Sequence, residues 1–152
     1  MMMTSVTKRP PGLMLRALSQ MIRSRLGTRL SEIGLTVTWY AVLNVLERGE
    51  AETGADLSRH FNTDPTAITR TIDRMEEAGL VKRKKHRTDR RRHIVVLTTK
   101  AHQVLPTAHS FASENEKLFF GVLEKEERQA FETLLMKLLD NAGKVGSLID
   151  WE

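Results

Sequence analysis

One segment of the chain, residues 62–80, carries helix boundary signals at both of its ends. The side chain of Asp64 can accept hydrogen bonds from the first free N–H groups of a helix, and Pro65 suits the first helical position because no N–H is needed there. Gly79 readily adopts the left-handed conformation that ends many helices, and Leu80 adds the apolar contact that usually follows. The sequence therefore predicts a helix that begins at Pro65 and ends just before Gly79.

This predicted helix has two different faces. Ile68, Ile72 and Met75 recur at helical spacing, so they form one apolar stripe that we expect to face a core. The polar side chains that lie largely off this stripe are Thr66, Thr69, Arg70, Asp73 and Arg74. The helix is therefore expected to present a Thr- and Arg-containing face to solvent or to a partner.

A strongly basic stretch follows the helix. Residues 82–92, KRKKHRTDRRR, hold eight of the 24 Lys and Arg residues and one of the 19 Asp and Glu residues, a local charge of +7. The rest of the chain has 16 basic and 18 acidic residues, so the net charge of +5 comes from this segment. Val81 is expected to begin a strand and residues 93–98 to form a second one. The basic stretch then becomes the tip of a β-hairpin.

A short helix is expected just before the segment. Thr53 is its candidate N-cap, and Asp56 at the third helical position completes a weak capping box. The helix should end near His60, after about two turns. A short helix, a tight turn and a second helix make a helix-turn-helix, and a hairpin follows at once. The predicted unit is a winged helix-turn-helix.

Further helices are expected on both sides of this unit. Apolar residues fall at helical spacing from Leu13, and Gly27 and Gly34 suggest that this first helix frays before the next element. Thr36 is expected to cap a helix that stops at Gly49.

The C-terminal part of the chain is expected to hold two helices. Thr99 is a candidate cap for a long helix through about Gly121, and Pro106 should kink this helix or shift its start. A last helix carries Ala130, Phe131, Leu134, Leu135, Leu138 and Leu139. The predicted fold class is mainly α with a small β-hairpin wing.

Composition excludes several classes of protein. The chain has 152 residues, enough for one domain or a domain plus a helical arm, and no Cys for a disulfide framework or a thiolate zinc site. No run approaches the roughly 18 apolar residues that cross a bilayer. The first twelve residues lack the apolar stretch of a signal peptide. We therefore expect a cytoplasmic protein without a membrane partner.

Signals for catalysis or metal binding are weak. His102 and His109 are seven residues apart on one expected helical face, but no acidic ligand lies near them in the sequence. The chain has no Gly-rich phosphate loop, nucleophile elbow or spaced carboxylate pair. We expect neither an enzyme, nor a metal site, nor a cofactor.

Three stretches together carry a resemblance to a known family. Residues 35–43 (LTVTWYAVL), 56–83 and 88–101 resemble the MarR/SlyA family of bacterial transcriptional regulators, and the likeness extends over nearly the whole chain. The second and third stretches are specific together, because they hold the recognition helix and the wing in the family's order and spacing.

Some positions depart from the family's pattern. The family often has Gln-Trp where this chain has Trp39-Tyr40, Gly where it has Ala101, and Ser or Thr where it has Glu124. None of these positions lies on the expected DNA-reading face.

The resemblance implies a homodimer and a division of the chain into four parts. These are a mobile tail (1–12), an N-terminal helix that contributes to dimerisation (13–34), the winged helix-turn-helix (35–99) and C-terminal dimerisation helices (100–152). Long apolar helices at both ends of the chain, with no sheet to cover, agree with this implication. The expected partner is double-stranded DNA with a pseudo-palindromic operator, whose half-sites lie about one helical turn apart.

The expected DNA-contacting residues lie on the capped helix and on the wing. Arg70 could contact guanine, and Arg74 could either grip a phosphate or pair with Asp73 or Glu77. The resemblance assigns Arg91 to the minor groove, with Asp89 orienting it or bracing the hairpin. Asp89 has a third possible role, that of a simple turn former. The full set is Pro65, Thr66, Thr69, Arg70, Arg74, Arg87, Asp89, Arg90 and Arg91.

The resemblance also implies an effector pocket between the first helices and the DNA-binding domain, for an aromatic carboxylate or a phenol. The matching positions are Ser19, Arg23, Thr38, Tyr40 and Asn44. Arg23 could pair with a carboxylate and Tyr40 could stack on a ring. In the alternative interpretation, Tyr40 belongs to the core and Arg23 is a surface or interface charge.

Three functions follow as hypotheses. The first is a DNA-binding regulator, most simply a repressor that an effector releases. The second is a ligand-independent DNA-organising protein, and the third is a winged-helix module that binds other proteins.

Overall fold

The computed structural model describes residues 9–145 and confirms the predicted fold class. The described part contains six helices and one two-stranded antiparallel sheet. The elements, in chain order, are α1 (Pro11–Ser31), α2 (Val37–Glu47), α3 (Gly54–His60), α4 (Pro65–Glu77), β1 (Val81–Lys85), β2 (His93–Leu97), α5 (Thr99–Phe120) and α6 (Lys125–Val145).

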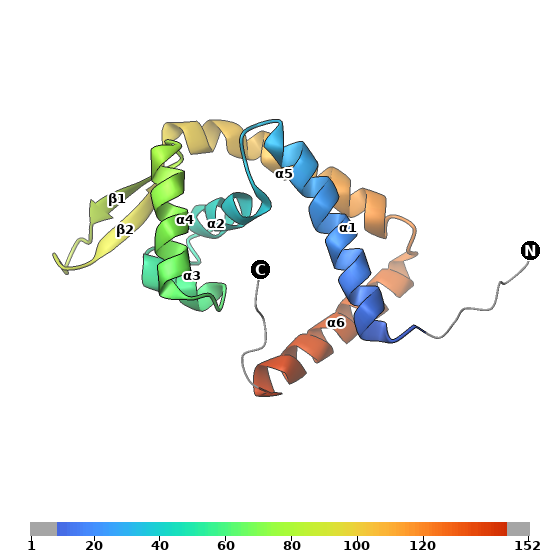
Figure 1. Ribbon diagram of the computed structural model, residues 1–152. Coiled ribbons are helices and arrows are strands. Elements are labelled where there is room, and N and C mark those ends of the chain that lie inside the picture. The colour runs from blue at the N-terminus through green and yellow to red at the C-terminus, as the bar shows by residue number, and fades with distance from the viewer. Residues whose placement is uncertain (1–8, 146–152) are drawn as a thin grey trace, which may run out of the picture.

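The elements gather into two regions (Figure 1). Helices α2, α3 and α4 lie together with the hairpin, which projects beside α4 with its tip pointing away from α1 and α6. Helix α5 continues from the hairpin and packs against β2, α2 and α1, so it connects the two regions. In the view of Figure 1, helix α6 crosses the N-terminal part of α1, and its C-terminal end runs back below α3.

Local capping explains both ends of α4. The Asp64 carboxylate accepts hydrogen bonds from the N–H groups of Thr66 and Ala67 at 2.9 and 3.1 Å. At the other end Gly79 has a φ of 75°, and the N–H of Leu80 donates to the carbonyl oxygen of Met75 at 2.9 Å. This is the Schellman arrangement, which satisfies the last free carbonyls of a helix. Both predicted boundaries are confirmed.

Helix α3 begins with the predicted capping box. The Thr53 hydroxyl accepts from the N–H of Asp56 at 3.1 Å, and the Asp56 carboxylate accepts from the N–H of Thr53 at 2.9 Å. Burial acts to raise the pKa of Asp56, but hydrogen bonds from Thr53, Glu52 and Arg59 outweigh it and lower the pKa to about 2. The carboxylate therefore stabilises the start of α3 in its ionised form.

The hairpin is fixed to the helices at its base. Strand β1 pairs with β2 in the register Val81↔Leu97 to Lys85↔His93. The N–H of Val95 donates to the carbonyl of Glu52 at 2.8 Å, which ties β2 to the segment before α3. The wing base is thus held from the side of α3 as well as from α4.

The first helix differs from the prediction. Helix α1 begins at Pro11 and continues through Gly27 to Ser31, so the predicted start at Leu13 and the fraying at Gly27 are wrong. A helical glycine costs about 1 kcal/mol, which tertiary packing outweighs. A Cβ at Gly27 would meet the side chain of Val37 at 3.5 Å, so α2 passes close to α1 at this position. A mobile tail was predicted over residues 1–12, of which 1–8 lie outside the described residues, while Pro11 and Gly12 belong to α1.

The long C-terminal helix also begins differently. Thr98, not Thr99, is the N-cap of α5, and its hydroxyl accepts from the N–H of Ala101 at 3.3 Å. The Thr98 hydroxyl also donates to the carbonyl of Gly79 at 2.6 Å, which fixes its position. Helix α5 begins at Thr99 and runs through Pro106, so the proline does not shift the start of the helix.

A single core joins the helices and the hairpin. Its fully buried side chains include Leu30, Leu43, Leu57, Met75 and Leu105. The predicted α4 stripe of Ile68, Ile72 and Met75 is buried, which confirms the assignment of that face.

Large apolar side chains remain exposed near both ends of the described chain. They are Leu13, Met14, Leu15, Met21, Leu118, Val122, Leu134, Met136, Leu138 and Leu139. An exposed apolar surface of this extent is typical of a surface that a partner covers. Within residues 9–145, no helix is long and apolar enough to cross a membrane.

Candidate nucleic-acid interface

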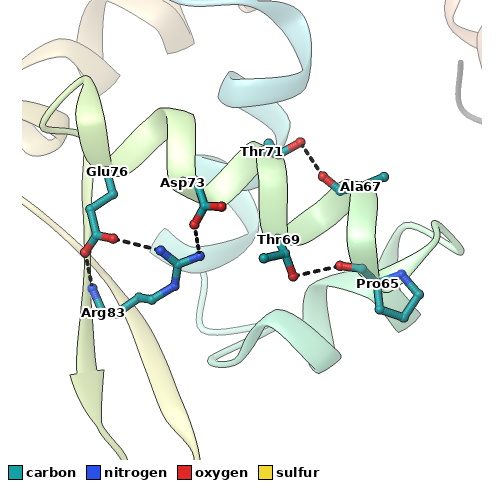
Figure 2. A network of polar contacts seen from close by, with 7 residues as sticks. All are labelled: Pro65, Ala67, Thr69, Thr71, Asp73, Glu76 and Arg83. Carbon is teal, nitrogen blue, oxygen red and sulfur yellow. Dashed lines mark hydrogen bonds and ion pairs between the residues drawn. The ribbon is translucent and has the colours of Figure 1, made fainter.

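The exposed face of α4 contains the residues that the sequence selected. Pro65, Thr66, Thr69, Arg70 and Arg74 are all exposed. The Thr69 hydroxyl donates to the carbonyl oxygen of Pro65 at 2.9 Å (Figure 2). Because its hydrogen is already used, this hydroxyl can offer a partner only its oxygen lone pairs, while the methyl group of Thr69 offers an apolar contact.

Neither Arg70 nor Arg74 forms an ion pair with another described residue. The pair of Arg74 with Asp73 or Glu77, which the sequence left open, is absent among residues 9–145. Asp73 pairs instead with Arg83 on strand β1. Both guanidinium groups on α4 are therefore available for an anionic partner.

Arg83 joins the wing to α4 (Figure 2). Its N–H donates to one carboxylate oxygen of Glu76 at 3.0 Å, and its guanidinium donates to the other at 2.7 Å. The same guanidinium contacts Asp73 at 2.5 Å. The N–H and then the guanidinium of Arg83 lower the pKa of Glu76. One arginine thus connects the base of the hairpin to two turns of the helix.

Sequence reasoning missed this network. Arg83 counted only as one of the eight cations of the basic stretch, yet two carboxylates balance its charge. The sequence does contain a signal for this network. Asp73 and Glu76 are three residues apart, so they share one helical face, and they lie close to the following basic strand.

The arginines of the wing tip are exposed to solvent. Arg87, Arg90 and Arg91 are exposed, and none of them forms an ion pair within the described chain. Asp89 accepts the N–H of Arg91 at 3.0 Å through its carboxylate, and the N–H of Arg92 donates to the carbonyl of Asp89 at 3.1 Å. This carboxylate contact to the N–H two residues on is the one that a turn-forming Asp makes, and it equally braces the hairpin tip.

A cavity of about 550 Å³ lies between α1, α2 and the start of α4. Arg23 of α1 and Thr38 of α2 line it, together with Ala41, Val42, His60, Phe61, Ala67 and Ile68. Ser19 lines an adjoining hollow along α1, to which Arg23 also contributes. Three of the five expected effector residues are therefore brought together.

Tyr40 and Asn44 line neither of these two spaces. The Tyr40 hydroxyl lies 3.0 Å from Nδ1 of His109 on α5, and Nε2 of His109 lies 2.8 Å from a Glu47 carboxylate oxygen. Burial raises the pKa of Tyr40. Helical geometry explains the difference, because Tyr40 and Asn44 share one face of α2 while Thr38, Ala41 and Val42 lie on another.

The turn between α3 and α4 supplies cavity residues that the sequence did not indicate. His60, the last residue of α3, lines the cavity together with Phe61, Asn62 and Thr63 of the turn. Asn62 has a φ of 47°, which reverses the chain there, and asparagine tolerates this conformation better than most residues. The described residues contain no cluster of three His, Asp or Glu side chains that could hold a metal ion.

Two helices joined by a tight turn and followed by a two-stranded hairpin define a winged helix-turn-helix protein. The model of the MarR family matches residues 33–92, which span α2 to the wing tip. This match confirms, over residues 33–92, the resemblance to the MarR family that the sequence motifs carry.

Known proteins resemble the chain over most of its length. An HTH-type transcriptional repressor of Mycobacterium tuberculosis is 24% identical over 129 residues, which are 85% of this chain and 93% of the repressor. A mutant MarR from E. coli complexed with operator DNA is 26% identical, with a TM-score of 0.78, over 84% of this chain and 92% of MarR. A probable transcriptional regulator from Pseudomonas aeruginosa is 26% identical, with a TM-score of 0.73, over 84% and 96% of the two chains.

Proposed function

We propose that this protein is a sequence-specific, double-stranded DNA-binding transcriptional regulator that acts as a repressor. The observation that carries the proposal is the pairing of two basic surfaces. Arg70 and Arg74, which form no ion pair with another residue of 9–145, lie on α4, and Arg83 attaches the basic hairpin to the same helix. A MarR relative complexed with operator DNA and a relative named as a repressor support the same function.

Each surface has its own role in this proposal. Helix α4 enters the major groove, where Arg70 donates to a guanine and Thr66 and Thr69 contact base edges or a thymine methyl. The wing follows the backbone, and Arg91 enters the adjacent minor groove, where a narrow A·T-rich stretch concentrates negative potential. The remaining wing cations release counterions from the phosphates, so binding weakens steeply as salt is added.

The proposed functional unit is a homodimer. The exposed apolar side chains lie mainly on α1 and α6, which Figure 1 places away from α4 and the wing. A second copy of the chain that covers them buries this surface and leaves both α4 helices free. A twofold dimer then recognises a pseudo-palindrome whose half-sites lie about one helical turn apart.

The cavity beside α4 is the proposed effector site, and a small aromatic carboxylate or phenol is the proposed ligand. Arg23 supplies a cation for a carboxylate, and Ala41, Val42 and Ile68 supply apolar walls. A ligand held between α1 and α4 favours one spacing of the two DNA-binding regions. A coupling of about 1–3 kcal/mol lowers DNA affinity roughly five- to 150-fold.

The test is fluorescence anisotropy against the DNA upstream of the protein's own gene, with excess random competitor, at two salt concentrations. We expect saturable binding that survives the competitor, falls steeply with salt and is lost in Arg70→Ala. Binding erased by the competitor would instead favour a DNA-organising protein. An absence of binding even at low salt would contradict the proposal and favour a protein-interaction module.

The same assay tests the effector site. A panel of hydroxybenzoates should release wild-type protein from DNA, whereas Arg23→Met should bind DNA normally and lose the response. Release that is equal in both proteins would place the ligand elsewhere.

A further inference from the structure

We propose that His86 is a positioning residue of the wing, whose Nδ1 atom orders the tip that presents Arg90 and Arg91. This inference rests on the proposed DNA-binding function. His86 directly follows β1, at the point where the chain leaves the paired strands and enters the tip. Its side chain is half-buried, whereas residues 87–92 are exposed.

Nδ1 of His86 lies within hydrogen-bond distance of three donors. The N–H groups of Thr88 and Asp89 both donate to it at 3.3 Å, and the Thr88 hydroxyl lies 3.2 Å away. A backbone N–H can only donate, so Nδ1 must be the unprotonated nitrogen of the ring. The neutral imidazole then carries its proton on Nε2.

This contact is part of a closed set of bonds around the tip. The N–H of His86 donates to the carbonyl of Arg92 at 2.9 Å, which closes the loop at its base. Asp89 accepts the N–H groups of Arg91 and Arg92 through its carboxylate and its carbonyl. His86 therefore holds the first half of the turn, and Asp89 holds the second half.

The composition of the tip makes such bonds necessary. Arg87, Arg90, Arg91 and Arg92 repel one another, and Asp89 is the one acidic residue in the stretch. Mutual repulsion favours an open, disordered loop. A tip that is ordered before binding loses less conformational entropy on DNA, which raises affinity.

A matched pair of substitutions separates this role from a direct contact with DNA. Asparagine is short and can place its Oδ1 acceptor close to the position of Nδ1. Glutamine is longer and places its amide near Nε2, where it can donate to a phosphate but cannot cap the N–H groups of the tip. His86→Asn therefore keeps the cap, and His86→Gln keeps only a possible phosphate contact.

The first readout does not involve DNA. Long-range ¹H–¹⁵N spectra of the full-length protein, at about pH 8 where histidine is ordinarily neutral, identify the protonated ring nitrogen. The His86 signal is assigned by its loss in His86→Asn. We expect the Nε2–H form. The Nδ1–H form would overturn the proposal whether or not the protein binds DNA.

The second readout is DNA affinity by anisotropy, for wild type, His86→Asn, His86→Gln and His86→Ala. We expect His86→Asn to stay within about twofold of wild type, and His86→Gln and His86→Ala to lose about tenfold. Equal loss in all three variants, or loss in none of them, would contradict the positioning role. If His86→Gln keeps the wild-type DNA affinity while His86→Asn loses affinity, His86 contacts a phosphate instead.

The two readouts separate the failure of the inference from that of the proposed function. Suppose that wild-type protein binds no DNA while the His86 ring is in the Nε2–H form. The hydrogen bonds to Nδ1 then exist, but the proposed DNA-binding function is wrong, and so is the positioning role that rests on it. Thermal midpoints of all variants serve as a folding control, and we expect them to agree closely because the tip lies outside the core.

Discussion

Arg83 differs from the other cations of residues 82–92 because Glu76 and Asp73 already balance its charge. Counting charges along the sequence treats it as one more phosphate contact. The structure shows that it is an internal support, and the difference matters for how DNA binding responds to salt. Each lost phosphate contact lowers the slope of log affinity against log salt concentration by about 0.9.

Arg83→Ala should therefore lower DNA affinity without changing this slope, because the variant loosens the wing but loses no phosphate contact. Arg90→Ala, which removes an exposed charge from the same hairpin, is the matched control and should reduce the slope by about 0.9. Anisotropy titrations at four salt concentrations measure the affinity and the salt slope of both variants. An equal reduction of the slope in the two variants would show that Arg83 contacts DNA directly.

At the scale of single residues, the sequence predicted some site positions better than others. Arg70, Arg74 and the exposed wing arginines follow from their place on a helix face or a hairpin tip. The position of Tyr40 does not follow from the resemblance alone. Helical periodicity, applied to α2, would have separated it from Thr38.

Among the elements, both boundaries of α4 were predicted correctly. The caps of α4 at Asp64 and Gly79 depend on residues within one turn of each helix end, so they can be read from the sequence. The continuation of α1 through Gly27 depends on packing against α2, which no local pattern contains. Thr98 and Thr99 are equivalent as caps in sequence, and the contact of Thr98 with Gly79 decides between them.

The capping box of α3 predicts a pH dependence of stability. Because the pKa of Asp56 is lowered from 3.8 to about 2, its contribution is complete above pH 3.8 and is lost as the pH falls towards 2. At neutral pH Asp56→Ala should lower the free energy of unfolding by about 1 kcal/mol. Urea denaturation at several pH values should show this difference shrinking only below pH 3.8. A difference that persists unchanged towards pH 2 would contradict the role of the ionised carboxylate.

For the whole molecule, the exposed apolar side chains of α6 predict that dimerisation depends on this helix. Leu134 and Leu138 lie one turn apart and are 59% and 54% exposed. Leu138→Glu should place a charge in the interface and weaken the dimer at least about tenfold. Gln129→Glu, on the other side of the same helix, is the control and should leave the dimer intact. Sedimentation equilibrium measures both variants, and an unchanged dimer in Leu138→Glu would exclude this face.

In the proposed dimer, two α4 helices related by a twofold axis read a DNA sequence together. Selection of binding sites from a random double-stranded library tests it without knowledge of the target gene. We expect enrichment of a pseudo-palindrome with half-site centres about 10 base pairs apart, and loss of that enrichment in Arg70→Ala. Enrichment of an unpaired single site, or of no motif at all, would contradict it.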